Sequence, residues 1–448
     1  MSQLNLHRYR DAVEQSVFVQ RVGYVRQLSG LSIEVVGLNA SIGELCLIQR
    51  LQTTDSTLSL QEPLLSEVVA IGRDCLILMP YGSVHGIGSG SEVRKNGNIA
   101  QIGVGYALLG RVIDGFGTPL DGFDAPQLKE LRSLKSAPIN PMQRPRIETV
   151  LETGVRCIDS LLTLGKGQRV GIFAGSGVGK STLLGMIARH IKADINVIAL
   201  IGERGREVRE FIDKQLGADG LSRSVVIVAT SDQPALARIR AAYAALAIAE
   251  FFRDEGKQVM LTMDSVTRFA MAKREIGLSA GEPPTARGYT PSVFSELPEL
   301  CERCGTSDTG GAISALLTVL VEGDDLNEPI SDSLRSILDG HIVLSRELAH
   351  KGQYPAIDVL KSVSRVMPDI TNREHRQLAI QTIKQLAIIE RNRQMVDIGA
   401  YVSGTNPMLD QALLIDFELQ QWLKQEDGGV SLNQGLGDLQ RILSQVKV

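Results

Sequence analysis

The chain has 448 residues, of which 43% are hydrophobic and 22% charged. At roughly one domain per 100–200 residues, this length predicts two to four domains. There are 47 lysines and arginines against 51 aspartates and glutamates, a net charge of −4, and only 4% of the residues are aromatic. Proteins that hold nucleic acid usually carry a basic excess and stack bases on aromatic side chains. The composition therefore disfavours a nucleic-acid-binding protein.

The cysteines and the apolar runs of the sequence indicate in which cellular compartment the protein is expected. Five scattered cysteines, an odd number, disfavour a disulfide framework and favour a reducing environment. The N-terminal stretch carries charges where a secretory signal needs apolar residues. The most apolar run, residues 241–252, is too short for a membrane span and contains Glu250. We expect a cytoplasmic protein.

The N-terminal third predicts three segments. Leu6, Tyr9, Val13 and Val17 recur at helical spacing, which predicts an amphipathic helix over residues 1–18 that either caps the next domain or docks a partner or a membrane surface. Short β-prone runs separated by glycines over residues 19–95 predict a small barrel or sandwich. Residues 96–147, with several turn signals and prolines, read as a connecting segment.

The remaining chain predicts two further domains. Apolar runs alternate with helical stretches over residues 148–371, which predicts a mostly parallel sheet covered on both faces. Residues 372–448 are helical in pattern. The predicted fold class is α/β, with a small N-terminal β-barrel, a central domain built on a parallel sheet, and a C-terminal helical domain.

A phosphate-binding loop is the most specific motif. A strand-like run enters AGSGVGKST and an apolar helix follows, so the glycines can curve backbone N–H groups around phosphate oxygens. Lys180 can reach the β- and γ-phosphates, and Ser181 can offer its hydroxyl to Mg²⁺. Ala174 stands where the strict pattern has glycine. The loop makes the central domain a P-loop NTPase (RecA-like) domain. It is predicted to bind a nucleoside triphosphate and Mg²⁺ through Gly175, Ser176, Gly177, Val178, Gly179, Lys180, Ser181 and Thr182.

Three charged residues outside this loop are candidates for the rest of an active site. Asp264 ends a buried strand-like run, where it can hold Mg²⁺ or cap the next helix. Glu203 ends another such run and can polarise water, although the neighbouring arginines could simply pair with it. Arg365 lies on a loop or strand end, from which it could complete a neighbouring subunit's site or remain a surface charge.

The assembled motifs resemble the α/β family of rotary-type ATPases, and within it the export ATPases of flagellar and injectisome type III secretion systems. PAIDVLKSVS matches the general family signature, whereas GERGREVREF and VEGDDLNEPI are typical of the secretion branch. VSGTNPMLDQAL favours the flagellar form over the injectisome form. The similarity covers nearly all of the chain from about residue 20.

The resemblance implies that the bound nucleotide is ATP, and it implies roles for individual residues. It makes Glu203 the catalytic carboxylate, Arg204 a contact of the γ-phosphate, and Arg365 an arginine finger inserted into the neighbouring subunit's site. For the adenine pocket it offers no aromatic residue at Arg376, where relatives often have one. Tyr354 and Tyr401 are candidates for that pocket, although their patterns favour core packing for each.

The resemblance also implies partners. They are further copies of the chain in a homohexamer, a stator-like regulator at the N-terminus, stalk and export-gate proteins, and chaperones with their export substrates, at the cytoplasmic face of the inner membrane. Three rival functions stay open: an RNA-translocating hexamer, a rotary ATP synthase or vacuolar-type subunit, and a nucleotide-binding assembly protein without turnover. Cys301 and Cys304 form a C-x-x-C without a second ligand pair, which predicts a buried helix face and no zinc site.

Overall fold

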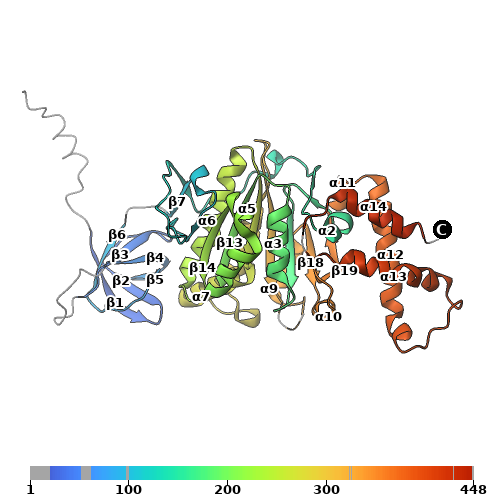
Figure 1. Cartoon of the computed structure of the whole chain (residues 1–448). Coiled ribbons are helices and arrows are strands. Elements are labelled where there is room, and N and C mark those ends of the chain that lie inside the picture. The colour runs from blue at the N-terminus through green and yellow to red at the C-terminus, as the bar shows by residue number, and fades with distance from the viewer. Residues whose placement is uncertain are drawn as a thin grey trace, which may run out of the picture. The chain divides into compact units, whose positions relative to one another are not determined.

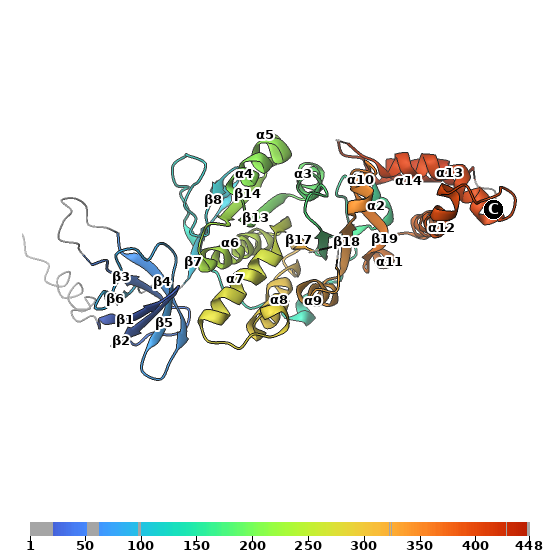
Figure 2. The same cartoon turned by 90° about the horizontal axis from the view of Figure 1, so that it is seen from below.

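The computed structural model describes residues 21–51, 62–96, 100–321, 323, 325–426 and 428–445. The predicted helix over residues 1–18 lies outside these residues. By its contacts the chain divides into two compact units, and the second begins at Gln101. Figures 1 and 2 show the elements of both units, which we describe separately.

The first unit contains a closed six-stranded antiparallel barrel in the order β1-β2-β5-β4-β3-β6 (Figure 1). Buried and partly exposed side chains alternate along β2, which places Ile33 and Val35 in the interior, as expected when one face of each strand points into a barrel. The predicted barrel is therefore confirmed. Its strands are β1 (Gly23–Ser29), β2 (Ser32–Val36), β3 (Leu45–Ile48), β4 (Leu64–Ile71), β5 (Leu76–Pro80) and β6 (Glu92–Lys95).

The second unit is built on a mostly parallel sheet with the order β19-β18-β12-β17-β15-β13-β14-β8. β13 and β17 are buried along nearly their whole length, as strands covered on both faces must be. The sheet comprises β8 (Val112–Ile113), β12 (Arg169–Ala174), β13 (Ile195–Glu203), β14 (Ser224–Thr230), β15 (Gln258–Asp264), β17 (Ala312–Leu320), β18 (Gly340–Leu344) and the antiparallel edge strand β19 (Ile357–Ser364), with β16 (Gly305–Thr306) paired to β17.

Helices cover both faces of this sheet, as the alternating pattern predicted. In Figure 2, α3 and α5 lie on one face and α7, α8 and α9 on the other. The α6 helix packs on β13, β14 and β15. The helices are α3 (Lys180–His190), α4 (Gly205–Glu210), the π-helical turn η3 (Phe211–Leu216), α5 (Gly217–Ser222), α6 (Ala235–Asp254), α7 (Val266–Ser279), α8 (Pro291–Glu302), α9 (Pro329–Ile337), α10 (Arg346–His350) and α11 (Met367–Ile370).

The chain ends in three helices, α12 (Arg373–Asp397), α13 (Pro407–Leu423) and α14 (Leu432–Leu443), which pack on α2 (Arg156–Leu161). Two small two-stranded sheets, β7 (Gln101–Val104) with β9 (Glu130–Ser133) and β10 (Val150–Leu151) with β11 (Leu164–Gly165), and the short 3-10 turns η1 (Tyr106–Leu108), η2 (Pro141–Gln143) and η4 (Ala286–Gly288) complete the unit.

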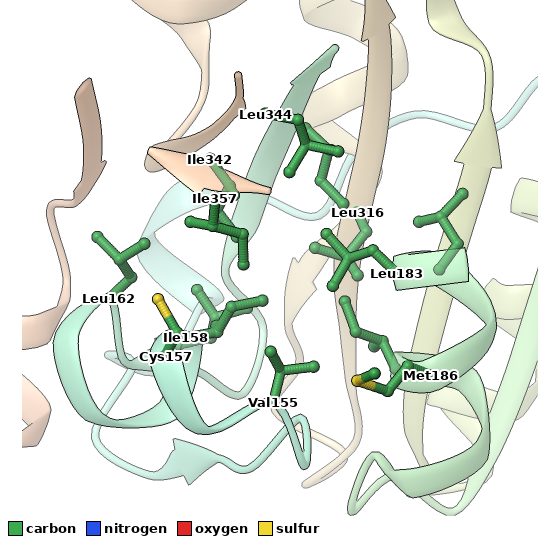
Figure 3. Close-up of a cluster of buried hydrophobic side chains, with 14 of the residues drawn as sticks. Val155, Cys157, Ile158, Leu162, Leu183, Met186, Leu316, Ile342, Leu344 and Ile357 are labelled. Carbon is green, nitrogen blue, oxygen red and sulfur yellow. The ribbon is translucent and has the colours of Figure 1, made fainter. Parts of the chain in front are cut away.

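A hydrophobic cluster fixes the helix that follows the phosphate loop. Figure 3 shows Leu183 and Met186 of α3 facing Leu316 of β17, with Ile158 of α2 and Ile342 of β18 on the other side. Val178, within the loop itself, is buried in the same cluster. The loop is thus anchored at its centre by an apolar side chain, while its glycines stay free to approach a ligand.

None of the described helices is long and apolar enough to cross a membrane. The apolar run of residues 241–252 lies in α6, which carries Glu250 at a buried position. The guanidinium of Arg303 donates to both carboxylate oxygens of Glu250, at 2.7 and 2.8 Å, and Ser136 Oγ donates at 2.7 Å. The acidic residue that interrupts the apolar run is therefore an internal tie between α6 and the end of α8.

We expect Glu250→Ala to destabilise the second unit by about 3–5 kcal/mol, because it leaves the Arg303 guanidinium buried without its counter-charge. Chemical denaturation followed by circular dichroism measures the effect. Glu255→Ala, at an exposed position just after α6, is the control. Equal denaturation midpoints for the two variants would show that the buried pair of Glu250 and Arg303 does not contribute to the stability of the unit.

Candidate active site

Three strands deliver the predicted site residues to one edge of the sheet. The phosphate loop follows β12, Glu203 ends β13 and Asp264 ends β15. The three strands are parallel, so their carboxyl ends share that edge, and β17 lies between β12 and β15. Ligands of open α/β sheets bind outside the carboxyl ends of such strands.

The phosphate loop has the backbone that its glycines predict. Gly177 and Gly179 have φ values of 79° and 86°, a left-handed region in which a side chain would be strained. Ser176, Gly177, Ser181 and Thr182 are exposed, so the ligand side of the loop is accessible. Ala174 is the last residue of β12 and is buried. Alanine suits this extended position, so the departure from the strict pattern does not disturb the loop.

Lys180 lies between two carboxylates. Its Nζ is 2.5 Å from Asp264 Oδ1 and 3.5 Å from Glu203 Oε1. The side chains of these three residues are 6–17% exposed. The structure therefore brings together three of the predicted site residues, although Lys180 and Asp264 lie 84 positions apart in the sequence.

Burial and neighbouring charges shift the ionisation of this cluster. Burial raises the pKa of Glu203 to about 7, and the charges of Asp264 and Glu207 add to the rise while Lys180 opposes it. Burial alone would lower the pKa of Lys180, but the attraction of Asp264 and Glu203 outweighs burial and raises it. The cluster thus pairs a fixed cation with a carboxylate poised near neutral pH, as general-base catalysis requires.

The two other predicted cationic residues lie apart from this cluster. The Arg204 side chain is 78% exposed and pairs with Glu207 at 3.5 Å. Arg365 follows the antiparallel strand β19, so it lies at the opposite edge of the sheet, where its N–H donates to Asp339 O beside the start of β12. The six residues of β12 span about 17 Å at 3.3 Å per residue. Arg365 cannot reach the phosphate loop of its own chain.

Of the two candidate tyrosines, Tyr354 lies beside the phosphate loop. Its side chain is 45% exposed, and a Cβ added at Gly179 would come within 3.2 Å of its ring. The backbone of Gln425, just after α13, donates to Tyr354 O at 2.9 Å. Tyr354 is therefore not a core residue. Tyr401 hydrogen-bonds Asp410 at the start of α13 and has a structural role there.

Sequence reasoning missed two residues of the site. Arg268, in α7, packs against Gly202, the residue before Glu203, and its Nε is buried without a hydrogen-bond partner among the described residues. Thr318, in β17, donates to Asp264 Oδ1 at 2.7 Å. The sequence offered only weak signals for them. Arg268 follows Asp264 by four positions and Thr318 is a polar residue inside an apolar run, but neither pattern says which strands are neighbours.

The C-x-x-C motif has no part in the site. Cys301 and Cys304 are free and buried at the end of α8, and burial raises the pKa of both thiols. Among the residues that the structure describes, no group of three or more histidine, cysteine or acidic side chains is placed to hold a metal ion. Both cysteines are buried as predicted, but only Cys301 lies on α8, whereas Cys304 lies two residues beyond its end.

Two family models match the chain. Residues 154–364 match the nucleotide-binding domain of the ATP synthase alpha/beta family, and residues 371–441 match the C-terminal domain of the T3SS ATPase EscN. The first match spans the phosphate loop, Glu203 and Asp264, and the second spans the three C-terminal helices.

Curated relatives and solved structures agree with these models. The chain is 53% identical to the flagellum-specific ATP synthase of Bacillus subtilis over 93% of both chains, and 50% identical to that of Salmonella typhimurium over 91% of this chain and 90% of the other. It is also 50% identical to the type 3 secretion system ATPase of Xanthomonas euvesicatoria over 88% of this chain and 87% of the other.

The assembled ATPase EscN of enteropathogenic Escherichia coli superimposes with a TM-score of 0.87 at 44% identity, covering 94% of this chain and all of the other. EscN in complex with its central stalk EscO gives a TM-score of 0.85. The resemblance drawn from the motifs is thereby confirmed. The chain is an ATP-hydrolysing enzyme of the ATP synthase alpha/beta family, and it belongs to the branch formed by the flagellum-specific and type III secretion system ATPases.

Proposed function

We propose that this ATPase energises protein export through a flagellar type III apparatus, releasing export substrates from chaperones and loading them into the export gate. The observation that carries the proposal is the cluster of Lys180, Glu203 and Asp264 behind an open phosphate loop. The motifs GERGREVREF and VEGDDLNEPI and the C-terminal domain of the same chain are those of export ATPases. The flagellar form is preferred because VSGTNPMLDQAL resembles it and because the flagellum-specific relatives reach 53% identity.

The residues at the sheet edge suit MgATP. Ser181 offers an exposed hydroxyl and Asp264 a carboxylate, which are the oxygen ligands that Mg²⁺ prefers. When bound, the ion would neutralise charge on the β- and γ-phosphates. The Arg268 guanidinium, with its unpaired Nε, can face an anion beside Glu203.

Hydrolysis then needs little covalent chemistry from the protein. Backbone N–H groups of residues 175–181 and the Lys180 ammonium hold the β- and γ-phosphates. Glu203 orients a water for in-line attack on the γ-phosphorus and is poised to accept its proton, while the bond from that phosphorus to the β-phosphate oxygen breaks. Arg204, exposed at the start of α4, can turn toward the transferred group.

Arg365 is proposed to act in the site of the adjacent protomer of a homohexamer. Its position at the sheet edge opposite its own phosphate loop supports this, because a finger that cannot serve its own chain can serve only another. The solved EscN relative is described as assembled, which is consistent with a ring.

Tyr354 is proposed to stack on the adenine ring. We expect Tyr354→Ala to raise the KM for ATP about 5- to 150-fold, since losing one base–aromatic stack costs about 1–3 kcal/mol. Tyr354→Phe should keep the wild-type KM, and Tyr401→Ala should do so too because Tyr401 contacts Asp410 instead. Steady-state kinetics over a range of ATP concentrations measure this. A wild-type KM for ATP in Tyr354→Ala would show that the adenine ring binds elsewhere.

The proposed partners follow from the same assignment. They are a stator-like regulator docked on residues 1–18, a central stalk comparable to the EscO bound by EscN, the export gate, and chaperones carrying export substrates. The enzyme would associate peripherally with the cytoplasmic face of the inner membrane at the export apparatus, without binding nucleic acid.

A chromosomal Glu203→Gln substitution in the bacterium that makes this chain tests the proposal. Flagellin and injectisome effectors are quantified in the culture medium beside the wild type. Loss of flagellin supports the flagellar assignment. Loss of effectors with flagellin retained would assign the enzyme to an injectisome, the second candidate, which the 50% identical secretion ATPase of Xanthomonas euvesicatoria favours. Unchanged export of both would contradict an export function.

A further inference from the structure

A buried hydroxyl group holds the carboxylate at the end of β15. Thr318 lies in β17, the strand between β15 and β12, and its side chain is fully buried. Its Oγ1 donates to Asp264 Oδ1 at 2.7 Å. A second acceptor, Met263 O, is 3.4 Å from that hydroxyl and is therefore the weaker partner.

Asp264 receives two donors on the same oxygen. Lys180 Nζ and Thr318 Oγ1 both contact Oδ1, at 2.5 and 2.7 Å. The lysine sits on a helix that opens at the phosphate loop, and in the proposed mechanism its ammonium turns to the phosphates when nucleotide binds. The threonine sits inside the sheet and cannot follow. Of these two donors, only Thr318 then keeps Asp264 in its orientation.

The strand that carries Thr318 is tied to the same junction a second time. The backbone N–H of Leu320 donates to Thr267 Oγ1 of α7 at 2.8 Å. Two hydrogen bonds therefore join the end of β17 to this junction, one at Asp264 itself and one at Thr267 in the first turn of α7. A hydroxyl fixed in this way defines the direction in which the second carboxylate oxygen of Asp264 points.

We infer that Thr318 is a positioning residue, whose hydroxyl orients the Asp264 carboxylate for the Mg²⁺ of bound nucleotide. This inference rests on the proposed assignment of Asp264 to magnesium. Groups that hold a metal-binding carboxylate from behind typically contribute 10- to 100-fold to metal affinity or activity, roughly the effect expected here.

Three substitutions separate the hydroxyl from the volume of the side chain. Thr318→Ser and Thr318→Ala differ only in the hydroxyl, and Thr318→Val keeps the shape of threonine without it. Thr382→Val is the control, because Thr382 is equally buried and its hydroxyl donates to Leu378 O in its own helix, α12. Asp264→Asn reports on the magnesium assignment itself.

The measurement is the affinity of the full chain for fluorescent methylanthraniloyl-ADP, with Mg²⁺ and with EDTA. We expect Thr318→Ala and Thr318→Val to lose about 10-fold or more of the gain in affinity that Mg²⁺ gives, with the affinity in EDTA unchanged. Thr318→Ser and Thr382→Val should keep the gain. The Mg²⁺ concentration for half-maximal ATPase activity should rise in parallel.

The outcomes distinguish two failures. If Asp264→Asn loses the gain but Thr318→Ala and Thr318→Val keep it, Thr318 only fills space and the inference is wrong. If Asp264→Asn keeps the gain, the magnesium assignment fails, and the role of Thr318 fails with it. Should Thr318→Val not fold, the comparison of serine with alanine decides, and equal loss in both of these variants would also overturn the inference.

Discussion

Glu203→Gln is expected to lower kcat for ATP hydrolysis by about 10²- to 10⁴-fold, the range that a positioned general base contributes. The carboxylate lies at the end of β13, 3.5 Å from Lys180, and burial raises its pKa to about 7. Glutamine preserves its volume but cannot accept a proton from the attacking water. Nucleotide binding should persist, because the phosphate loop and Lys180 are untouched.

Steady-state kinetics and methylanthraniloyl-ADP binding on the same preparation separate these effects. Glu210→Gln is the matched control, since Glu210 is an exposed carboxylate on α4 that pairs with Lys214. A Glu203→Gln enzyme with wild-type turnover would remove Glu203 from the catalytic machinery. Loss of ADP binding along with turnover would make Glu203 a structural partner of Lys180 instead of a base.

Arg365→Ala is expected to lower turnover by about 10³- to 10⁵-fold, as the removal of an arginine finger does in other phosphoryl-transfer enzymes. The exposed guanidinium stands at the far edge of the sheet from its own phosphate loop, so the loss should arise between protomers. Specific activity of the wild type should also rise with protein concentration as the ring assembles. Arg391→Ala, an exposed arginine of α12, is the control.

Mixing two inactive variants tests the action in trans. Lys180→Ala lacks a working phosphate loop but retains Arg365, whereas Arg365→Ala has the loop and lacks the finger. In a randomly mixed ring of equal parts, about a quarter of the interfaces join an intact loop to an intact finger, because each interface is head-to-tail. Activity should therefore return on mixing. A mixture as inactive as its components would exclude trans action.

Local patterns in the sequence predicted most of the site. The residues of the phosphate loop are consecutive in the sequence. Its glycines predict a left-handed backbone that other residues adopt only with strain, and Gly177 and Gly179 have such positive φ values. Glu203 and Asp264 could be found because each directly follows an apolar run, and the parallel strand order brought them to Lys180. The barrel, the parallel sheet and the C-terminal helices followed from periodicity and were confirmed.

Contacts between distant strands could not be read in this way. Thr318 is one polar residue in an apolar strand, and nothing local says that β17 lies beside β15 and directs its hydroxyl at Asp264. The same holds for Tyr354, which sequence reasoning left open between core and pocket and which the structure sets, half-exposed, beside Gly179.

By itself, the sequence determined the strand ends, the phosphate loop and the charged residues that follow each strand, because these depend on short-range backbone geometry and on periodic burial. Only the tertiary structure decided the order of the strands and which edge each residue occupies. Because of that order, Lys180 Nζ lies within 3.5 Å of carboxylate oxygens of both Glu203 and Asp264, and Arg365 lies at the opposite edge of the sheet. The physical reason is that strand pairing is chosen by packing of the whole sheet, a long-range property that no single segment carries.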